Sequence, residues 1–202
     1  MSKKPGIWAV VLAAGESKRM NGPKLILPYG KSTIIAHLIE NILESEIDNI
    51  MVVLGGWRDE LGKAIKDLPV SSCYNGNYRS GMLSSVICGI DSLPPDAGAA
   101  MIIPGDQPGI TPDVINSLIR TLNETGRGII VAVHKGKRGH PVLISRKFFD
   151  QIRSLDPDIG LRDLPAKSGN EVYEVETGDN KILMDIDTNK DYLEAINKSK
   201  QR

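Results

Sequence analysis

Short apolar runs alternate with amphipathic segments along most of the chain. Four of these runs are rich in Val, Ile, Ala and Met and are bounded by glycine, proline or charge. They cover residues 7–14, 50–54, 99–104 and 129–133. Nearly continuous apolar runs of this length are typical of strands buried on both faces of a parallel sheet.

Segments with helical spacing lie between these runs. Residues 33–43 place five apolar side chains on one stripe, with Ser32 or Thr33 as the cap. Further helices are predicted over residues 59–68, 82–93 and 112–122. Strands alternating with helices imply right-handed crossovers, so the predicted fold class is α/β, a three-layer α/β/α sandwich around a mostly parallel sheet.

The helix over 112–122 has the clearest start, with Thr111 as its cap and Pro112 at its first position. The last third is less regular. It predicts a strand over 141–145, helices over 146–154 and 160–166, an edge strand over 171–177 and a closing helix over 188–199. The length of 202 residues, with no repeat or linker, predicts a single domain over residues 1–202.

Charge and cysteine content narrow the possible functions. Lysine plus arginine total 25, as do aspartate plus glutamate, so the formal charge of zero argues against nucleic-acid binding by bulk phosphate neutralisation. Cys73 and Cys88 lack metal-ligand spacing and suit small buried or half-buried thiols in a reducing compartment. The first apolar run is too short for a membrane span and is followed by charge. We therefore expect a cytoplasmic protein that binds no membrane.

The segment after the first predicted strand, residues 11–29, carries glycines and cations close together. Glycine lets the backbone approach an anion, and Arg19 and Lys24 supply positive charge, so the segment suits phosphate binding. Neither G-x-x-x-x-G-K-[ST] nor G-x-G-x-x-G occurs here, which argues against a P-loop NTPase and a dinucleotide-dependent oxidoreductase. On composition alone, a basic surface loop remains an equal alternative.

Carboxylates follow two extended segments. Asp106 comes directly after the apolar run over 99–104, where open α/β sheets bind ligands, and it could hold Mg²⁺ or open a turn. Asp185 and Asp187 alternate on an extended segment and should face the same side. They could complete a metal site, or Asp187 could cap the closing helix.

Two further segments have weaker signals. His140 lies between glycine and proline, a position more typical of a structural turn than of a base. The serines at 84 and 85 could contact a ligand at a helix start or cap that helix. No order of Ser, His and Asp supports a hydrolase.

Taken together, these residues resemble one family. The stretch LAAGESKRMNGPKLILP, residues 12–28, is similar to the nucleotide signature of the MobA-like nucleotidyltransferases, closest to the molybdenum cofactor cytidylyltransferase branch. Four further elements resemble that branch in the expected order, and the resemblance spans about residues 7–193. These elements are Asn75-x-x-Tyr78-x-x-Gly81-Met82-x-x-Ser85, Gly105-Asp106-Gln107-Pro108, Gly139-His140-Pro141 and Asp185-Ile186-Asp187-Thr188.

The resemblance implies a Rossmann-like nucleotidyltransferase fold and Mg²⁺-dependent transfer of CMP from CTP to molybdopterin, with release of pyrophosphate. The guanylyl branch usually has Leu-Ala-Gly-Gly where this chain has Leu12-Ala13-Ala14-Gly15, and the methyl group of Ala14 would restrict room near a purine. Two alternatives remain: a GTP-using guanylyltransferase, and a non-catalytic carrier or maturation factor for a molybdenum hydroxylase such as xanthine dehydrogenase.

The resemblance also implies roles for particular residues. It divides the domain into a nucleotide-binding half, about residues 7–110, and an acceptor-binding half, about 111–193. Lys24, Arg19 and Asp106 would be catalytic, and Asp106 and Asp187 would hold the metal. The nucleotide would contact Leu12, Ala13, Ala14, Gly15, Ser17, Arg19, Lys24, Asn75, Gly81 and Ser85. The acceptor would contact Gln107, His140, Gly160 and Arg162, although Pro157 departs from the Gly-Asp-x-Gly element that usually precedes the short helix.

Overall fold

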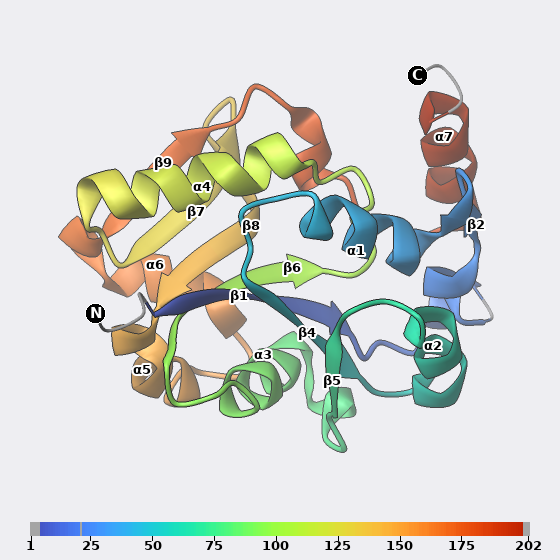
Figure 1. Ribbon diagram of the computed structural model, residues 1–202, viewed down its shortest axis with the longest axis horizontal. Helices are drawn as coiled ribbons and strands as arrows, with labels where there is room; N and C mark the ends of the chain where they lie inside the picture. The colour runs from blue at the N-terminus through green and yellow to red at the C-terminus, as the bar shows by residue number, and fades with distance from the viewer. Residues whose placement is uncertain (1–4, 21, 200–202) are drawn as a thin grey trace.

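The fold is built around a seven-stranded sheet (Figure 1). A computed structural model describes residues 5–20 and 22–199. The strand order is β5-β4-β1-β6-β8-β7-β9, and a separate two-stranded ribbon joins β2 to β3. The strands are β1 (Gly6–Ala13), β2 (Pro28–Tyr29), β3 (Ser32–Thr33), β4 (Asn49–Leu54), β5 (Ser71–Tyr74), β6 (Ala97–Pro104), β7 (Ile129–His134), β8 (Lys137–Ser145) and β9 (Val172–Glu176).

The sheet is mostly parallel, as predicted. β1 lies in its centre and pairs in parallel with both β4 and β6, so that Val10 lies opposite Met51 on one side and Ile102 on the other. Only β8 runs against its neighbours, pairing antiparallel with β6 and β7. The carboxyl ends of β1 and β6 therefore meet at one edge of the sheet.

Helices cover both faces of the sheet and form two apolar cores (Figure 1). α1 (Ile34–Leu43), α2 (Arg58–Ile65) and α4 (Pro112–Thr125) pack with Ala9 and Val11 of β1. α3 (Met82–Asp91) and α5 (Phe149–Arg153), with Leu164 of α6 (Asp163–Lys167), pack with Val10 on the opposite face. Alternate residues of β1 thus enter different cores, which explains why its sequence is apolar throughout.

The closing helix, α7 (Asn189–Ser199), lies beside the ribbon formed by residues 28–33, although the two are far apart in sequence (Figure 1). Tyr192 of α7 donates a hydrogen bond to the carbonyl oxygen of Pro28 at 2.8 Å. No helix in the described parts of the chain has the length and apolar content needed to span a bilayer.

Most predicted elements are present, with changes at their boundaries. Thr33 caps α1 by accepting a hydrogen bond from the backbone of Ala36, whereas Thr111 precedes α4 without such a bond. The predicted edge strand is β9, at the end of the sheet. The strand predicted over 141–145 begins earlier, at Lys137, and the helices predicted over 146–154 and 160–166 each begin as a 3₁₀ turn.

Three strands were not predicted: β5, and the two short strands β2 and β3. β5 forms the other edge of the sheet, where three of its four residues are exposed, so its sequence lacks the apolar run of a central strand. The ribbon of β2 and β3 is too short to give a periodic signal. Cys73 of β5 and Cys88 of α3 are half-buried free thiols whose sulfur atoms lie 3.7 Å apart.

Two helical glycines provide a matched test of the packing of α3 on β1. A Cβ atom at Gly89 would lie 2.4 Å from Cγ1 of the fully buried Val10, whereas a Cβ at Gly62 of α2 would meet nothing within 4 Å. We expect Gly89→Ala to lower the free energy of unfolding by about 1–3 kcal/mol because the core is overpacked. Gly62→Ala should raise it by up to about 1 kcal/mol, since alanine favours helix.

Urea unfolding of both variants measures this difference. Equal stability of the Gly89 and Gly62 variants would show that α3 does not pack on β1 as closely as described.

Candidate active site

The loop after β1 and the end of β6 lie together at the carboxyl edge of the sheet. The backbone N–H of Gly105 donates to the carbonyl oxygen of Leu12 at 2.9 Å. A side chain at position 105 would place its Cβ at the same 2.9 Å from that oxygen, so this approach requires glycine. The contact brings Asp106 to the loop that carries Lys24, at the edge where open α/β sheets bind ligands.

Lys24 joins two carboxylates from distant parts of the chain. It begins a 3₁₀ turn, Lys24–Ile26, and its Nζ lies 2.7 Å from Oδ2 of Asp106 and 3.0 Å from Oδ1 of Asp187. Its side chain is only 12% exposed. Burial lowers the pKa of Lys24, but the adjacent Asp106 and Asp187 outweigh it, so the pKa lies above its usual value. The ammonium is therefore charged at neutral pH.

Asp187 reaches this site because its segment is hydrogen-bonded to the loop at the end of β6. The N–H of Ile186 donates to the carbonyl oxygen of Asp106 at 3.0 Å, and Arg19 pairs with the other carboxylate oxygen of Asp187 at 2.8 Å.

The alternative in which Asp187 caps the closing helix is wrong. Thr188 Oγ1 accepts a hydrogen bond from the N–H of Asp191, whose carboxylate accepts from the N–H of Thr188 in return. This reciprocal pair caps α7 and leaves the carboxylate of Asp187 to face Lys24 and Arg19.

A cavity of about 500 Å³ opens over these residues. It is called the nucleotide cavity after the residues that were predicted from the sequence to bind a nucleotide. Its size falls within the range of small-molecule sites. Of the twelve residues predicted from the sequence to bind the nucleotide or the metal, ten line this cavity and two do not. The ten are Leu12, Ala14, Gly15, Ser17, Arg19, Lys24, Gly81, Ser85, Asp106 and Asp187. Ala13 lies in the apolar core instead, and Asn75 lies behind the cavity wall.

Asn75 forms hydrogen bonds with residues in the wall of the nucleotide cavity. Its side chain is 4% exposed, and its amide nitrogen donates to Oγ of Ser84 at 2.9 Å and of Ser85 at 3.0 Å. Its amide oxygen accepts from the N–H of Asn77 at 2.9 Å. With its polar atoms bonded within the protein, Asn75 positions Ser85 and does not face the cavity.

A second charged cluster, which was not predicted from the sequence, lies in the same cavity. The carboxylate of Glu16 accepts hydrogen bonds from Arg79 at 2.8 Å and from Tyr78 at 3.2 Å, and Lys18 lies 3.2 Å away. The contacts with Arg79 and Lys18 hold the pKa of Glu16 at about 2. Arg79 follows Glu16 by 63 residues, so no local pattern could have indicated the pair.

A second cavity of about 570 Å³ adjoins the first, and Met82 lines both. It is called the acceptor cavity after the residues that were predicted from the sequence to contact an acceptor. All four residues predicted to contact the acceptor line it, namely Gln107, His140, Gly160 and Arg162. Much of its wall comes from residues 157–165 and 182–185. Burial lowers the pKa of His140, which the charge of Asp106 partly offsets, so its imidazole is neutral at neutral pH.

Asp185 and Asp187 face different cavities, which corrects the expectation that they share one side. Asp185 lines the acceptor cavity and accepts a hydrogen bond from the amide nitrogen of the buried Gln107. Burial raises the pKa of Asp185. The two carboxylates diverge because residues 184–187 are not part of the sheet, so the alternation of a paired strand does not apply. The amide oxygen of Gln107 is buried and has no hydrogen-bond partner among the described residues.

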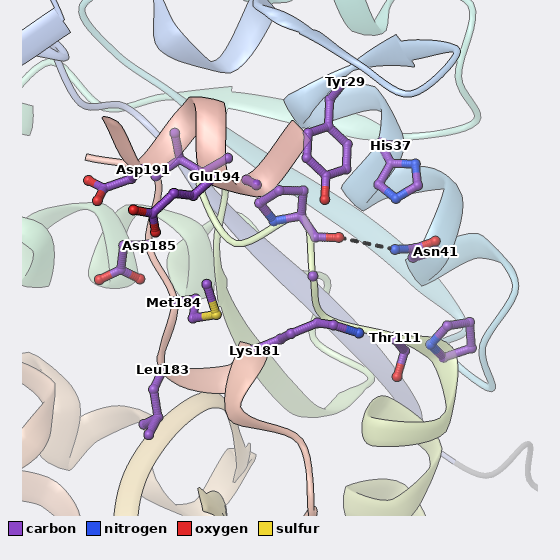
Figure 2. A pocket seen from close by; sticks show the side chains of 15 residues that line it. Tyr29, His37, Asn41, Thr111, Lys181, Leu183, Met184, Asp185, Asp191 and Glu194 are labelled. Carbon is purple, nitrogen blue, oxygen red and sulfur yellow. Dashed lines mark hydrogen bonds between the residues drawn. The ribbon is translucent and has the colours of Figure 1, made fainter. Parts of the chain in front are cut away.

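A third cavity, of about 560 Å³, lies on the other side of the segment that carries Asp185 (Figure 2). His37 and Asn41 of α1 line one wall, and Glu194 of α7 lines another. The amide of Asn41 donates to the carbonyl oxygen of Pro108, which joins α1 to the loop after β6. Apart from Asp185, which borders this cavity and the acceptor cavity, none of the residues predicted to bind a ligand or a metal lines it.

The donor set in the nucleotide cavity suits a hard cation. Asp106 and Asp187 offer carboxylate oxygens that contact one ammonium. No group of three or more His, Cys, Asp or Glu within residues 5–20 and 22–199 could hold a metal. Mg²⁺ is usually bound by one or two carboxylates together with substrate phosphates, so the two residues fit that pattern.

These features define a class of protein. A mostly parallel sheet, a cation-bearing loop after its central strand and a carboxylate at the end of the neighbouring strand are those of a nucleotide-binding α/β enzyme. The chain belongs to the MobA-like NTP transferase domain family, whose sequence model matches residues 9–172, and it is a nucleotidyltransferase. The family resemblance found in the sequence is thereby confirmed.

Similar proteins support the same assignment. The molybdenum cofactor cytidylyltransferase of Escherichia coli K12 is 28% identical over 190 residues, covering 94% of this chain and 95% of that protein. Rv0371c of Mycobacterium tuberculosis has the same fold, with a TM-score of 0.86 and 26% identity over 96% of this chain and 99% of that one. A structure of Rv0371c in complex with manganese matches with a TM-score of 0.80 and 24% identity, covering 96% of this chain and 100% of that one.

The role of Asn75 can be tested by a matched pair of variants. Asn75→Ala would leave the buried Ser85 hydroxyl without its donor, so we expect the free energy of unfolding to fall by about 1–3 kcal/mol. Asn77 lies two residues away and is exposed, and Asn77→Ala should change stability by less than about 0.5 kcal/mol. Chemical denaturation measures both, and a similar small effect at the two positions would contradict the positioning role.

Proposed function

We propose that this nucleotidyltransferase moves CMP from CTP to a phosphorylated acceptor, a molybdopterin cofactor, and releases pyrophosphate. The observation that supports this most is the contact of 2.7 Å between Lys24 and Asp106 inside the nucleotide cavity. A second cavity, lined largely by the last third of the chain, adjoins it and offers room for an acceptor. We propose the same division of the domain, with a nucleotide-binding half to about residue 110 and an acceptor-binding half beyond it.

We infer the preference for CTP from the surroundings of Ala14. Ala14 lines the nucleotide cavity and is 4% exposed. Ala14 has no room to move away from the cavity, because it packs closely against Gly55. A Cβ atom at Gly55 would lie only 2.7 Å from the methyl carbon of Ala14. The methyl group would restrict the room for a base, which would favour a pyrimidine over a purine. The name of the Escherichia coli relative, a cytidylyltransferase, agrees with this preference.

The reaction we propose is in-line attack by a terminal phosphate of the acceptor on the α-phosphorus of CTP. Such chemistry needs positioning and charge neutralisation more than covalent help. Lys24 and Arg19 would bind the triphosphate, with the backbone of residues 14–17 around it. The planar guanidinium of Arg19 suits two phosphate oxygens, and Lys24 acts as a point charge.

Asp106 and Asp187 would hold a divalent cation, which we propose to be Mg²⁺. When bound, the cation would neutralise charge that develops on the pyrophosphate leaving group. The manganese complex of the structurally similar Rv0371c agrees with a divalent ion.

Gln107, His140, Gly160 and Arg162 would position the acceptor. No strong general base is needed, because the second pKa of a phosphate monoester is about 6. His140 would then act as a neutral hydrogen-bonding group. The product would pass to a molybdenum hydroxylase as the protein partner.

An assay with four nucleotides tests this function. Purified protein is given molybdopterin and each of CTP, GTP, ATP and UTP with Mg²⁺, and pyrophosphate release is measured. We expect release with CTP. Release with GTP alone would establish a guanylyltransferase instead. Tight binding of the cofactor without pyrophosphate release from any nucleotide would establish a carrier.

Lys24→Ala and Asp106→Ala test the catalytic roles. Lys24→Ala removes a positive charge that would stabilise the transition state, and Asp106→Ala removes a ligand of the cation that would do so. We expect the pyrophosphate release rate of each to fall by a factor on the order of 10²–10³. Lys63→Ala, on the exposed side of α2 and outside the three cavities, is the matched control and should keep the wild-type rate. Circular dichroism checks that the fold is retained. A wild-type rate for either variant would remove that residue from the mechanism.

His140→Gln tests whether the histidine binds or transfers a proton. Burial lowers the pKa of His140 from its usual value, so we expect its neutral imidazole to contribute no ionisation to the profile at and above neutral pH. We expect KM for the acceptor to rise about 2- to 10-fold, from the loss of one hydrogen bond. The pH profile of kcat/KM between pH 6.5 and 8.5 should keep its shape. Loss of an ionisation in that range on substitution would indicate proton transfer.

A further inference from the structure

Every cation that lines the nucleotide cavity, within the part of the chain described, is already paired with an acid of the same cavity. Glu16 and Asp187 each pair with two cations, and Asp106 with one. The pairs are Lys18–Glu16 at 3.2 Å, Arg79–Glu16 at 2.8 Å, Arg19–Asp187 at 2.8 Å, Lys24–Asp106 at 2.7 Å and Lys24–Asp187 at 3.0 Å. A polyphosphate that binds these cations must therefore exchange with carboxylates.

Lys24 differs from the other three cations in two respects. Its single ammonium contacts both carboxylates that suit a divalent ion, and its side chain is 12% exposed, compared with 82% for Lys18 and 68% for Arg19. The contact with Lys24 is thus the least screened by water. A cation that used Oδ2 of Asp106 and Oδ1 of Asp187 as ligands would need the lone pairs now directed at Lys24 and would repel its charge.

We propose that Lys24 is an internal counter-ion that competes with the divalent cation for Asp106 and Asp187. When the nucleotide binds, its phosphates pair with the ammonium of Lys24, which then no longer contacts the two carboxylates. Metal and nucleotide therefore bind cooperatively, and the metal alone binds weakly. This inference rests on the proposed function for the identity of the nucleotide, but its first consequence concerns the metal alone.

The competition predicts an effect in both directions: bound nucleotide favours metal binding, and bound metal favours nucleotide binding. If Lys24 couples the two ligands, each must raise the affinity of the other by the same factor, because binding free energies are linked around a closed cycle. The site then favours metal and nucleotide bound together over either one alone. The same contact keeps two carboxylates from facing each other unpaired before substrate binds.

Titration with Mn²⁺ alone tests the first consequence. Binding to the full chain is measured by electron paramagnetic resonance without nucleotide, in about 0.15 M salt. We expect Lys24→Met, which keeps the length of the side chain and removes its charge, to bind Mn²⁺ more tightly by a factor on the order of ten. Lys18→Met removes the same charge from the same cavity but not from these carboxylates, and it should leave the affinity within about twofold of wild type.

A non-hydrolysable nucleotide tests the second consequence. The affinity for α,β-methylene-CTP is measured with EDTA and with saturating Mn²⁺, in wild type and in Lys24→Met. Chelation of Mn²⁺ by free nucleotide is the same for both proteins and cancels in the comparison. We expect the gain on adding Mn²⁺ to be on the order of tenfold larger in wild type.

Two further variants make the result decisive. Adding Asp106→Asn to Lys24→Met should abolish the gain in Mn²⁺ affinity, and Lys24→Gln should reproduce that gain if the methionine variant unfolds. Unchanged or weaker Mn²⁺ binding by the folded Lys24 variants, or a gain that survives Asp106→Asn, would overturn the proposal. If no nucleotide gives pyrophosphate while Lys24→Met still binds Mn²⁺ more tightly, the proposed function fails and the competition stands.

Discussion

The site depends on one ammonium shared by two carboxylates. Lys24 is separated from Asp106 by 82 residues and from Asp187 by 163, so the contact joins the start, the middle and the end of the chain at one edge of the sheet. Because the lysine side chain is only 12% exposed, these charges attract each other more strongly than an exposed pair does. Loss of the lysine charge would leave two carboxylates close together, with Arg19 as the remaining partner of Asp187.

The arrangement of the strands places this contact where chemistry can occur. β1 and β6 are parallel neighbours, so their carboxyl ends deliver the cationic loop and Asp106 to the same place. The segment of residues 184–187 then crosses this edge and separates the surroundings of Asp185 from those of Asp187. Two adjoining cavities result, one rich in charge and one lined by His140 and Gln107, as a transfer between two substrates requires.

Several parts of this arrangement could be predicted from local sequence. Central strands such as β1 and β6 are apolar on both faces, and the stripe of α1 is regular, so their existence follows from burial alone. The loop of residues 12–28 carries its chemistry in adjacent positions, and Asp106 comes after a second apolar strand. The family resemblance is what joined Lys24 and Asp106 in one expected site. β5 could not be found in this way, because an exposed edge strand needs few apolar residues.

The sequence by itself determined the buried strands, the main helices and the family, since each depends on residues close together along the chain. Only the tertiary structure decided which charges meet. Glu16 pairs with Arg79, Asn75 holds Ser85 instead of facing the cavity, and Asp187 faces Lys24 instead of capping α7. The physical reason is that a side chain's partner depends on how strands and loops align in space, and periodicity within one segment carries no information about that alignment.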